Sequence, residues 1–262
     1  MLEARERRRL FGALAPMVPS VEAMYDGPAG LAEFKSNGEE FLRILRDVCD
    51  LRPDERMLDV GSGIGRKTIP LTQYLDANAT YEGIDVNANG VAWCREKITS
   101  RFSNFRFQQI DVHNALYNPQ GTGSPADYRF PFPDRSFTFV LLGSVFTHMR
   151  PAEVEHYLGE IARVLASDGR CLISYFLLND FSRHTHGSLE FGQEHDGWAT
   201  ISEEIPERAI ALDEALVRDL YQRAGLEIVR VDYGSWCGRA GAVSYQDLIV
   251  ARRAPDSALP SS

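Results

Sequence analysis

The segment Met57–Gly65 constrains the fold more than any other part of this 262-residue chain. A short apolar run ends in Asp59, and a turn that contains three glycines follows it. These are Gly61, Gly63 and Gly65. The spacing of apolar side chains in residues 66–75 then predicts a helix. A strand, a glycine turn and a helix in this order bring the backbone close to a ligand, because glycine has no Cβ to collide with it.

A second strand is predicted at Tyr81–Val86, about twenty residues further along the chain, and it carries Asp85 near its end. A carboxylate at the carboxyl edge of the second strand suits the two hydroxyls of a ribose. We therefore expect a cofactor that contains a nucleoside.

The spacing of the glycines distinguishes between two cofactor classes. A dinucleotide fingerprint reads G-x-G-x-x-G and receives a pyrophosphate at a helix N-terminus. Here the third glycine comes one residue earlier, and Arg66 stands in the last position. Asp59 would repel a phosphate but suits an ammonium group. S-adenosylmethionine has an ammonium, a sulfonium and a ribose without a phosphate, so Asp59 and Asp85 favour it over NAD; a dehydrogenase is the more distant alternative.

Three later segments extend this pattern, at Phe107–Val112, Asp134–Ser144 and Ile161–Ile173. Together with the glycine turn, they make the chain resemble a class I S-adenosylmethionine-dependent methyltransferase over roughly residues 37–176. The resemblance implies an α/β fold: a seven-stranded, Rossmann-like doubly wound sheet with an antiparallel terminal strand, an N-terminal helical lid and a cap insertion. The sequence departs from the family at Thr138, where Asp is usual.

The resemblance also assigns cofactor-binding residues, which lie in the glycine turn or follow the parallel strands. They are Asp59, Gly61, Gly63, Asp85, Val86, Asp111, Val112 and Gly143. In the family, the acid of the third strand meets the adenine amino group, and the residue after the second-strand acid flanks the adenine.

We divide the chain into a lid segment at 1–36, a methyltransferase domain at 37–254 and a flexible tail at 255–262. The domain contains a cap insertion at about 178–212, a segment longer than the usual connection between a strand and a helix. Apolar periodicity predicts a helix over 37–50 and another that ends near Gly225. Alternation predicts strands over 226–233 and 245–252, which in the family pattern form the antiparallel pair. In the lid segment, Tyr25, Phe34 and Lys35 are candidate ligand contacts among which the sequence does not select.

Composition limits the partners. The net charge of −9 argues against a nucleic-acid substrate, because phosphate contacts need a basic face. No apolar run approaches the roughly twenty residues that a membrane span needs. The four cysteines show no C-x-x-C pairing, which indicates free buried thiols and a cytoplasmic protein. The oligomeric state, a homodimer included, is left open.

The end of the fourth strand indicates the acceptor. Methyltransferases of base amino groups carry an Asn or Asp followed by Pro-Pro and an aromatic residue there, whereas this chain has Leu142–Phe146. A hydroxyl acceptor must lose its proton, and histidine is a common general base near neutral pH. His148 lies just beyond the strand and is the predicted catalytic base. The alternative is that His148 caps or packs the turn before the helix that begins near Pro151.

Other polar residues give weaker hypotheses. Among the remaining histidines, candidate substrate contacts lie in the cap insertion, at His184, His186 and His195. His113 is expected to frame the adenine or pack locally, and His156 to be structural. Acids of the cap could join a histidine in holding a divalent ion such as magnesium, or they are simply solvated, so the metal ligands stay unknown. These acids are Asp180, Glu194 and Asp196.

Short strings such as Ser144–Met149 and Gly234–Arg239 resemble a bacterial subgroup of sugar and glycan O-methyltransferases. This resemblance implies a saccharide hydroxyl as the acceptor. Aromatic side chains at Tyr128, Trp198 and Trp236 could stack on a sugar ring, and core packing is the alternative for each. Arg183 and Arg239 would serve the hydroxyls. The alternative functions are O-methylation of a lipid or natural product, and cofactor binding without catalysis.

Overall fold

A computed structural model describes residues 2–27 and 30–254 of the chain, and the tail predicted at 255–262 lies outside the described residues. The chain divides into two compact units, residues 1–110 and 111–262. No helix of the described residues is long and apolar enough to cross a membrane. The four cysteines are free and buried, as predicted.

The first unit is built on three parallel strands. They are β1 (Arg56–Val60), β2 (Thr80–Asp85) and β3 (Phe105–Gln109), with β2 in the middle. The apolar residues of β1 and β2 are buried, which is typical of a parallel sheet covered on both faces. Because the strands are parallel, their carboxyl ends lie at one edge, where the glycine turn follows β1 and Asp85 ends β2.

Helices of the first unit differ from the predicted bounds. They are α1 (Leu2–Phe11), η1 (Gly12–Met17), η2 (Val21–Ala23), α2 (Leu31–Asp47), α3 (Thr68–Leu71), α4 (Ala88–Cys94) and η3 (Arg95–Thr99). The helix expected over 37–50 begins six residues earlier, because Leu31 and Phe34 continue its buried face. The helix expected over 66–75 is reduced to the single turn α3, with Pro70 inside it and turns after it.

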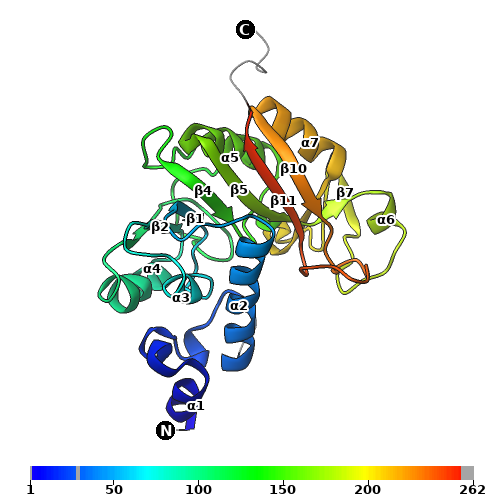
Figure 1. Cartoon of the computed structure of the whole chain (residues 1–262). Helices are drawn as coiled ribbons and strands as arrows, with labels where there is room; N and C mark the ends of the chain where they lie inside the picture. Colours follow the sequence, from blue (N-terminus) through cyan, green and yellow to red (C-terminus); the bar gives the residue numbers. More distant parts are fainter. Residues whose placement is uncertain (1, 28–29, 255–262) are drawn as a thin grey trace. The chain divides into compact units, whose positions relative to one another are not determined.

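The second unit continues with four strands that lie side by side in Figure 1. They are β4 (Phe137–Leu142), β5 (Leu165–Tyr175), β11 (Asp247–Arg253) and β10 (Leu226–Asp232). β4 and β5 are parallel, while β11 runs antiparallel to both β5 and β10. The predicted antiparallel terminal pair is thereby confirmed. In the described residues these four strands and β1–β3 make the seven-stranded mixed sheet of the predicted Rossmann-like fold.

Two long helices accompany these strands, α5 (Pro151–Val164) and α7 (Glu214–Arg223). Both have a buried apolar face, and α5 begins with proline at its first position, where the missing N–H costs nothing. Residues 118–133 have no helix or named strand.

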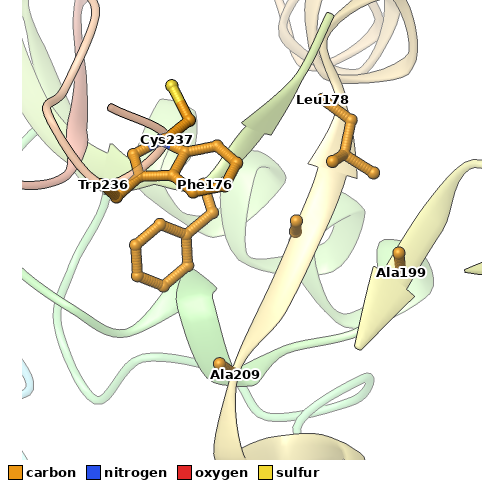
Figure 2. Packing of buried hydrophobic residues seen from close by; sticks show 7 residues of the cluster. Phe176, Leu178, Ala199, Ala209, Trp236 and Cys237 are labelled. Atoms are coloured by element: carbon orange, nitrogen blue, oxygen red, sulfur yellow. The ribbon is translucent and has the colours of Figure 1, made fainter. Parts of the chain in front are cut away.

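The cap insertion has a small sheet of its own, which the sequence did not predict. Its elements are β6 (Leu177–Leu178), α6 (Asp180–Arg183), β7 (Gln193–His195), β8 (Trp198–Thr200), η5 (Pro206–Arg208) and β9 (Ile210–Asp213), with strand order β6-β9-β8-β7. Figure 2 shows the buried cluster beneath this sheet, where Phe176 and Trp236 pack with their ring centroids 5.3 Å apart. Small residues, Ala199 and Ala209 among them, let the strands approach these rings.

Candidate functional site: a cofactor turn and a buried histidine

The glycine turn is tied to the neighbouring strand at the carboxyl edge of the first unit. The backbone N–H groups of Gly61 and Ser62 donate to the carbonyl of Ile84 at 2.8 and 3.2 Å. Gly63 has a φ of +59°, and a Cβ on it would lie 2.0 Å from Oδ2 of Asp26. Glycine is therefore favoured at this position, because a side chain would be strained at this φ and would displace the Asp26 carboxylate.

Asp85 organises the same turn with both of its carboxylate oxygens. Oδ2 accepts the N–H of Gly63 at 2.8 Å, and Oδ1 accepts the N–H of Asn87 at 2.7 Å. Burial raises the pKa of Asp85 to about 6, with the Asn87 and Gly63 N–H groups acting in the opposite direction. Each carboxylate oxygen has a further lone pair, which suits the two hydroxyls of a ribose. Val86 is half-buried beside it.

Asp59 is completely buried and already has a cation from the chain itself. Its Oδ2 accepts the hydroxyl of Tyr81 at 2.7 Å, and its Oδ1 lies 3.7 Å from Nζ of Lys67. The same Nζ donates to the carbonyl of Gly61 at 2.9 Å. The ammonium that Asp59 was predicted to receive from a cofactor is therefore matched here by Lys67. The sequence argument overlooked Lys67, although a buried acid requires a nearby cation.

The lid-segment candidates have different surroundings. A Cβ on Gly90 would lie 2.1 Å from the Tyr25 hydroxyl, so Tyr25 covers that glycine. Phe34 is buried, with its ring centroid 6.3 Å from that of Phe11, and is a core residue. Lys35 pairs with Glu39 one helical turn away. Among the three, only Tyr25 lies at the glycine turn.

In the second unit, Asp111 and Val112 are held by the loop that follows them. The exposed carboxylate of Asp111 accepts the Thr122 N–H at 3.2 Å and its hydroxyl at 2.5 Å, and these bonds lower the pKa of Asp111. Val112 is buried, and its carbonyl accepts the side-chain amide of Asn118 at 3.0 Å. His113 beside them is exposed.

The end of β4 carries a strained turn before His148. Gly143 is buried, and Ser144 has a φ of +62°, which is uncommon for a residue with a side chain. The Ser144 N–H donates to Oγ of Ser174 at 2.7 Å, and its hydroxyl donates to Gln246 at 3.0 Å. The 3₁₀ turn η4 (Phe146–His148) follows and ends in the histidine.

The surroundings of His148 determine its tautomer and charge. Nδ1 lies 2.6 Å from the carbonyl oxygen of Glu207. A carbonyl can only accept, so Nδ1 carries the proton and Nε2 of the neutral ring presents a lone pair. Burial lowers the pKa of His148 below 6.5, and the Glu207 carbonyl only partly opposes that effect. The ring is therefore neutral at pH 7, and its edge-to-face contact with Tyr117 fixes its orientation.

The other histidines are occupied in different ways. Nε2 of His156 lies 2.9 Å from the carbonyl of Tyr128, in keeping with the structural role predicted for it. Nδ1 of His184 lies 2.6 Å from the carbonyl of Asp180, and His195 stacks on Trp198 with 4.0 Å between ring centroids. His186 is almost fully exposed. Across residues 2–27 and 30–254, no group of three or more His, Cys, Asp or Glu side chains is arranged to hold a metal ion.

Trp236 is a core residue and not a surface platform for a sugar ring. It is 2% exposed, and its Nε1 donates to Asp247 at 2.7 Å. Asp247 also accepts the N–H groups of Leu177 and Gly234, each at 2.7 Å. The sequence argument missed Asp247, since a single acid at the start of a strand gives no signal. Trp198 is half-buried, and one face of it is covered by His195.

Comparisons with known proteins show what the chain is similar to. Residues 58–173 match the family model of a methyltransferase domain. A fatty-acid O-methyltransferase of Mycolicibacterium smegmatis is 30% identical over 177 residues, which cover 67% of this chain and about half, 49%, of that protein.

Two solved structures share the fold. The PH0226 protein from Pyrococcus horikoshii matches with a TM-score of 0.59 and 17% identity, covering 95% of this chain and 98% of the other. A 1,6-didemethyltoxoflavin N1-methyltransferase from Burkholderia thailandensis, solved with its substrate and S-adenosylhomocysteine, matches with a TM-score of 0.54 and 16% identity over 90% and 85% of the two chains.

Residues 58–173 thus match a methyltransferase domain, and the seven-stranded sheet of the described residues has a Rossmann-like fold. The two solved structures share that fold.

Proposed function

We propose that this protein is an S-adenosylmethionine-dependent O-methyltransferase. The glycine turn and Asp85 would hold the cofactor, because Asp85 closes the turn through the Gly63 N–H and retains acceptor capacity toward a ribose. When bound, S-adenosylmethionine supplies an electrophilic methyl group on a sulfonium. The contribution of the protein is then to orient an acceptor oxygen and to remove its proton.

The observation that supports a hydroxyl acceptor is the neutral, oriented imidazole of His148, because a hydroxyl must lose its proton when it is methylated. Its Nε2 lone pair would take the hydroxyl proton as the oxygen attacks the methyl, while Nδ1 stays bonded to the Glu207 carbonyl. A pKa below 6.5 keeps the base unprotonated at neutral pH. His148 is therefore proposed as the general base of a hydroxyl methylation.

The proposed acceptor is a hydroxyl of a saccharide or glycan precursor. Exposed polar residues of the cap insertion support it, among them His184, His186 and Glu190. The burial of Trp236 leaves fewer aromatic platforms for a sugar ring than the sequence indicated. Tyr128 and Trp198 are the aromatic candidates that stay at least partly accessible.

A second candidate acceptor is a lipid carboxyl group, and it is favoured by the relative that is a fatty-acid O-methyltransferase. A carboxylate has already lost its proton at neutral pH, so its methylation requires no general base. The need for His148 therefore separates the two candidates.

The decisive measurement is transfer of label from S-adenosylmethionine to saccharides, fatty acids, phenols and proteins, by wild type and by His148→Asn. For a hydroxyl acceptor we expect His148→Asn to lose about 10²- to 10⁴-fold in kcat/KM. In wild type, kcat/KM should fall at acidic pH as the ring takes up a proton, and at a lower pH than for an ordinary imidazole, because burial lowers the pKa of His148. His156→Asn is the matched control, because it also replaces a histidine bonded to a carbonyl.

Other outcomes change the proposal. If label appears on a fatty acid and the His148→Asn variant is as active as wild type, the acceptor is a carboxylate and not a hydroxyl. A bound cofactor with no labelled acceptor in any class would favour a binding protein without catalysis.

A further inference from the structure

The lid segment lies directly on the glycine turn of the first unit. A Cβ on Gly63 would meet the Asp26 carboxylate at 2.0 Å, and one on Gly90 would meet the Tyr25 hydroxyl at 2.1 Å. Two glycines far apart in the sequence are therefore covered by two adjacent residues. Asp26 thus belongs to the wall of the proposed cofactor site.

Asp26 and Arg66 form an incomplete ion pair at this position. Nη2 of Arg66 and Oδ2 of Asp26 are 3.9 Å apart, beyond hydrogen-bond length. Within the described part of the chain, Oδ1 of Asp26 and Nε of Arg66 are both buried without a hydrogen-bond partner. Buried charged groups that lack partners are costly, so each orphaned atom indicates a ligand group of opposite charge.

Of the neighbouring acids, Asp85 accepts two backbone N–H groups. Asp59 accepts the Tyr81 hydroxyl, and its Oδ1, which is also buried without a hydrogen bond, lies 3.7 Å from Nζ of Lys67. Asp26 differs from both, because the arginine paired with it also has a buried nitrogen without a hydrogen-bond partner. Burial raises the pKa of Asp26, an effect that a bound cation would oppose.

We propose that Asp26 and Arg66 together bind the amino-acid end of the cofactor, with Asp26 accepting from its ammonium and Arg66 donating to its carboxylate. The amino-acid end of the cofactor has one positive and one negative group, and Asp26 and Arg66 offer one charge of each sign to match them. The inference rests on the proposed function and deepens it, because it transfers recognition of the ammonium from Asp59 to a residue of the lid segment. Arg66, one position beyond the turn, then has a role that the glycine pattern alone does not give it.

Three ligands separate the two contacts in calorimetric titrations of the whole protein. S-adenosylmethionine has both charged groups, its decarboxylated form lacks only the carboxylate, and 5′-methylthioadenosine lacks both. Asp26→Asn should weaken S-adenosylmethionine and the decarboxylated ligand about tenfold or more, and leave methylthioadenosine unchanged. Arg66→Gln should weaken S-adenosylmethionine alone by a similar factor.

Methylthioadenosine is also the internal test of folding, because it needs the turn and Asp85 but neither proposed contact. Glu22→Gln removes an exposed charge from the same segment and should change no affinity. The inference would be overturned if Asp26→Asn and Arg66→Gln lowered the affinity for all three ligands equally, or lowered none of them. The proposed function would then still stand. A wild type that binds none of the three would overturn both.

Discussion

Two regions of the molecule bury an aspartate almost completely, and they neutralise its charge in different ways. At the glycine turn of the first unit, Asp59 is matched by the ammonium of Lys67 and the hydroxyl of Tyr81. At the start of β11 in the second unit, Asp247 accepts three N–H groups, from Leu177, Gly234 and Trp236. Burial raises the pKa of both carboxyl groups.

The two arrangements serve different purposes. Lys67 also bonds the carbonyl of Gly61, so its pair with Asp59 shapes the turn where a ligand is proposed. Asp247 joins the start of the cap insertion to the loop at 234–236, and its donors are groups of the fold itself. The comparison teaches that a buried acid marks a site only when its surroundings leave it a group to bind. Asp247 does not meet this condition, whereas Asp26 and Asp59 each keep one buried oxygen without a hydrogen bond, and that of Asp59 lies 3.7 Å from Nζ of Lys67.

The largest effect should come from Asp247→Ala, which leaves three buried N–H groups without an acceptor. Each such group costs about 1–3 kcal/mol, so the free energy of unfolding should fall by roughly 4 kcal/mol. Urea unfolding followed by circular dichroism measures it. Glu227→Ala, which removes an exposed partner of Arg252, is the control and should change stability by less than about 0.5 kcal/mol. If Asp247→Ala lowered the free energy of unfolding by a similarly small amount, water would have replaced the carboxylate as the acceptor of the three N–H groups.

Lys67→Met tests the other region, because it leaves Asp59 as a buried charge without its cation. We expect a loss of about 3 kcal/mol in unfolding free energy at pH 7. Adding Asp59→Asn should restore most of that loss, since removing both charges is close to neutral.

The pH dependence sharpens this test. The pKa of Asp59 in the folded state is above its unfolded value of 3.8, so the folded state binds the proton more tightly. Stability of Lys67→Met should therefore rise as the pH falls from neutral toward 4, and the double variant should lack that rise. A flat pH profile in the single variant would contradict a charged Asp59.

Periodicity was sufficient to predict individual strands, because these depend on local apolar pattern, while the antiparallel terminal pair was implied by the family resemblance. The predicted ends of helices were less accurate where packing against other segments determines them. The start of α2 at Leu31 depends on burial of Leu31 and Phe34 by the rest of the unit. The small sheet of the cap also escaped prediction, since its strands are short and β7 is exposed throughout.

In the candidate site, motifs in the sequence single out some residues, whereas residues defined by contact give no such signal. Asp85 and Gly63 are hydrogen-bonded, as a motif at the edge of the sheet would suggest. Asp26, Lys67 and Glu207 carry no pattern in the sequence, because their roles arise from segments brought together by folding. The tautomer of His148, for example, depends on a backbone carbonyl 59 residues away.

The smallest of these effects is expected for Trp236→Phe, which removes one of the three donors to Asp247 and keeps an aromatic ring in the cluster of Figure 2. A hydrogen bond to a charged group contributes about 1.5–3 kcal/mol, so the loss in unfolding free energy should be about 2 kcal/mol, half of that for Asp247→Ala. Because Trp236 is buried, KM for the acceptor should stay unchanged in methyl-transfer assays. A rise in KM with unchanged stability would instead place Trp236 in the acceptor site, and the loop before β11 would then have a binding role like the one proposed for the glycine turn.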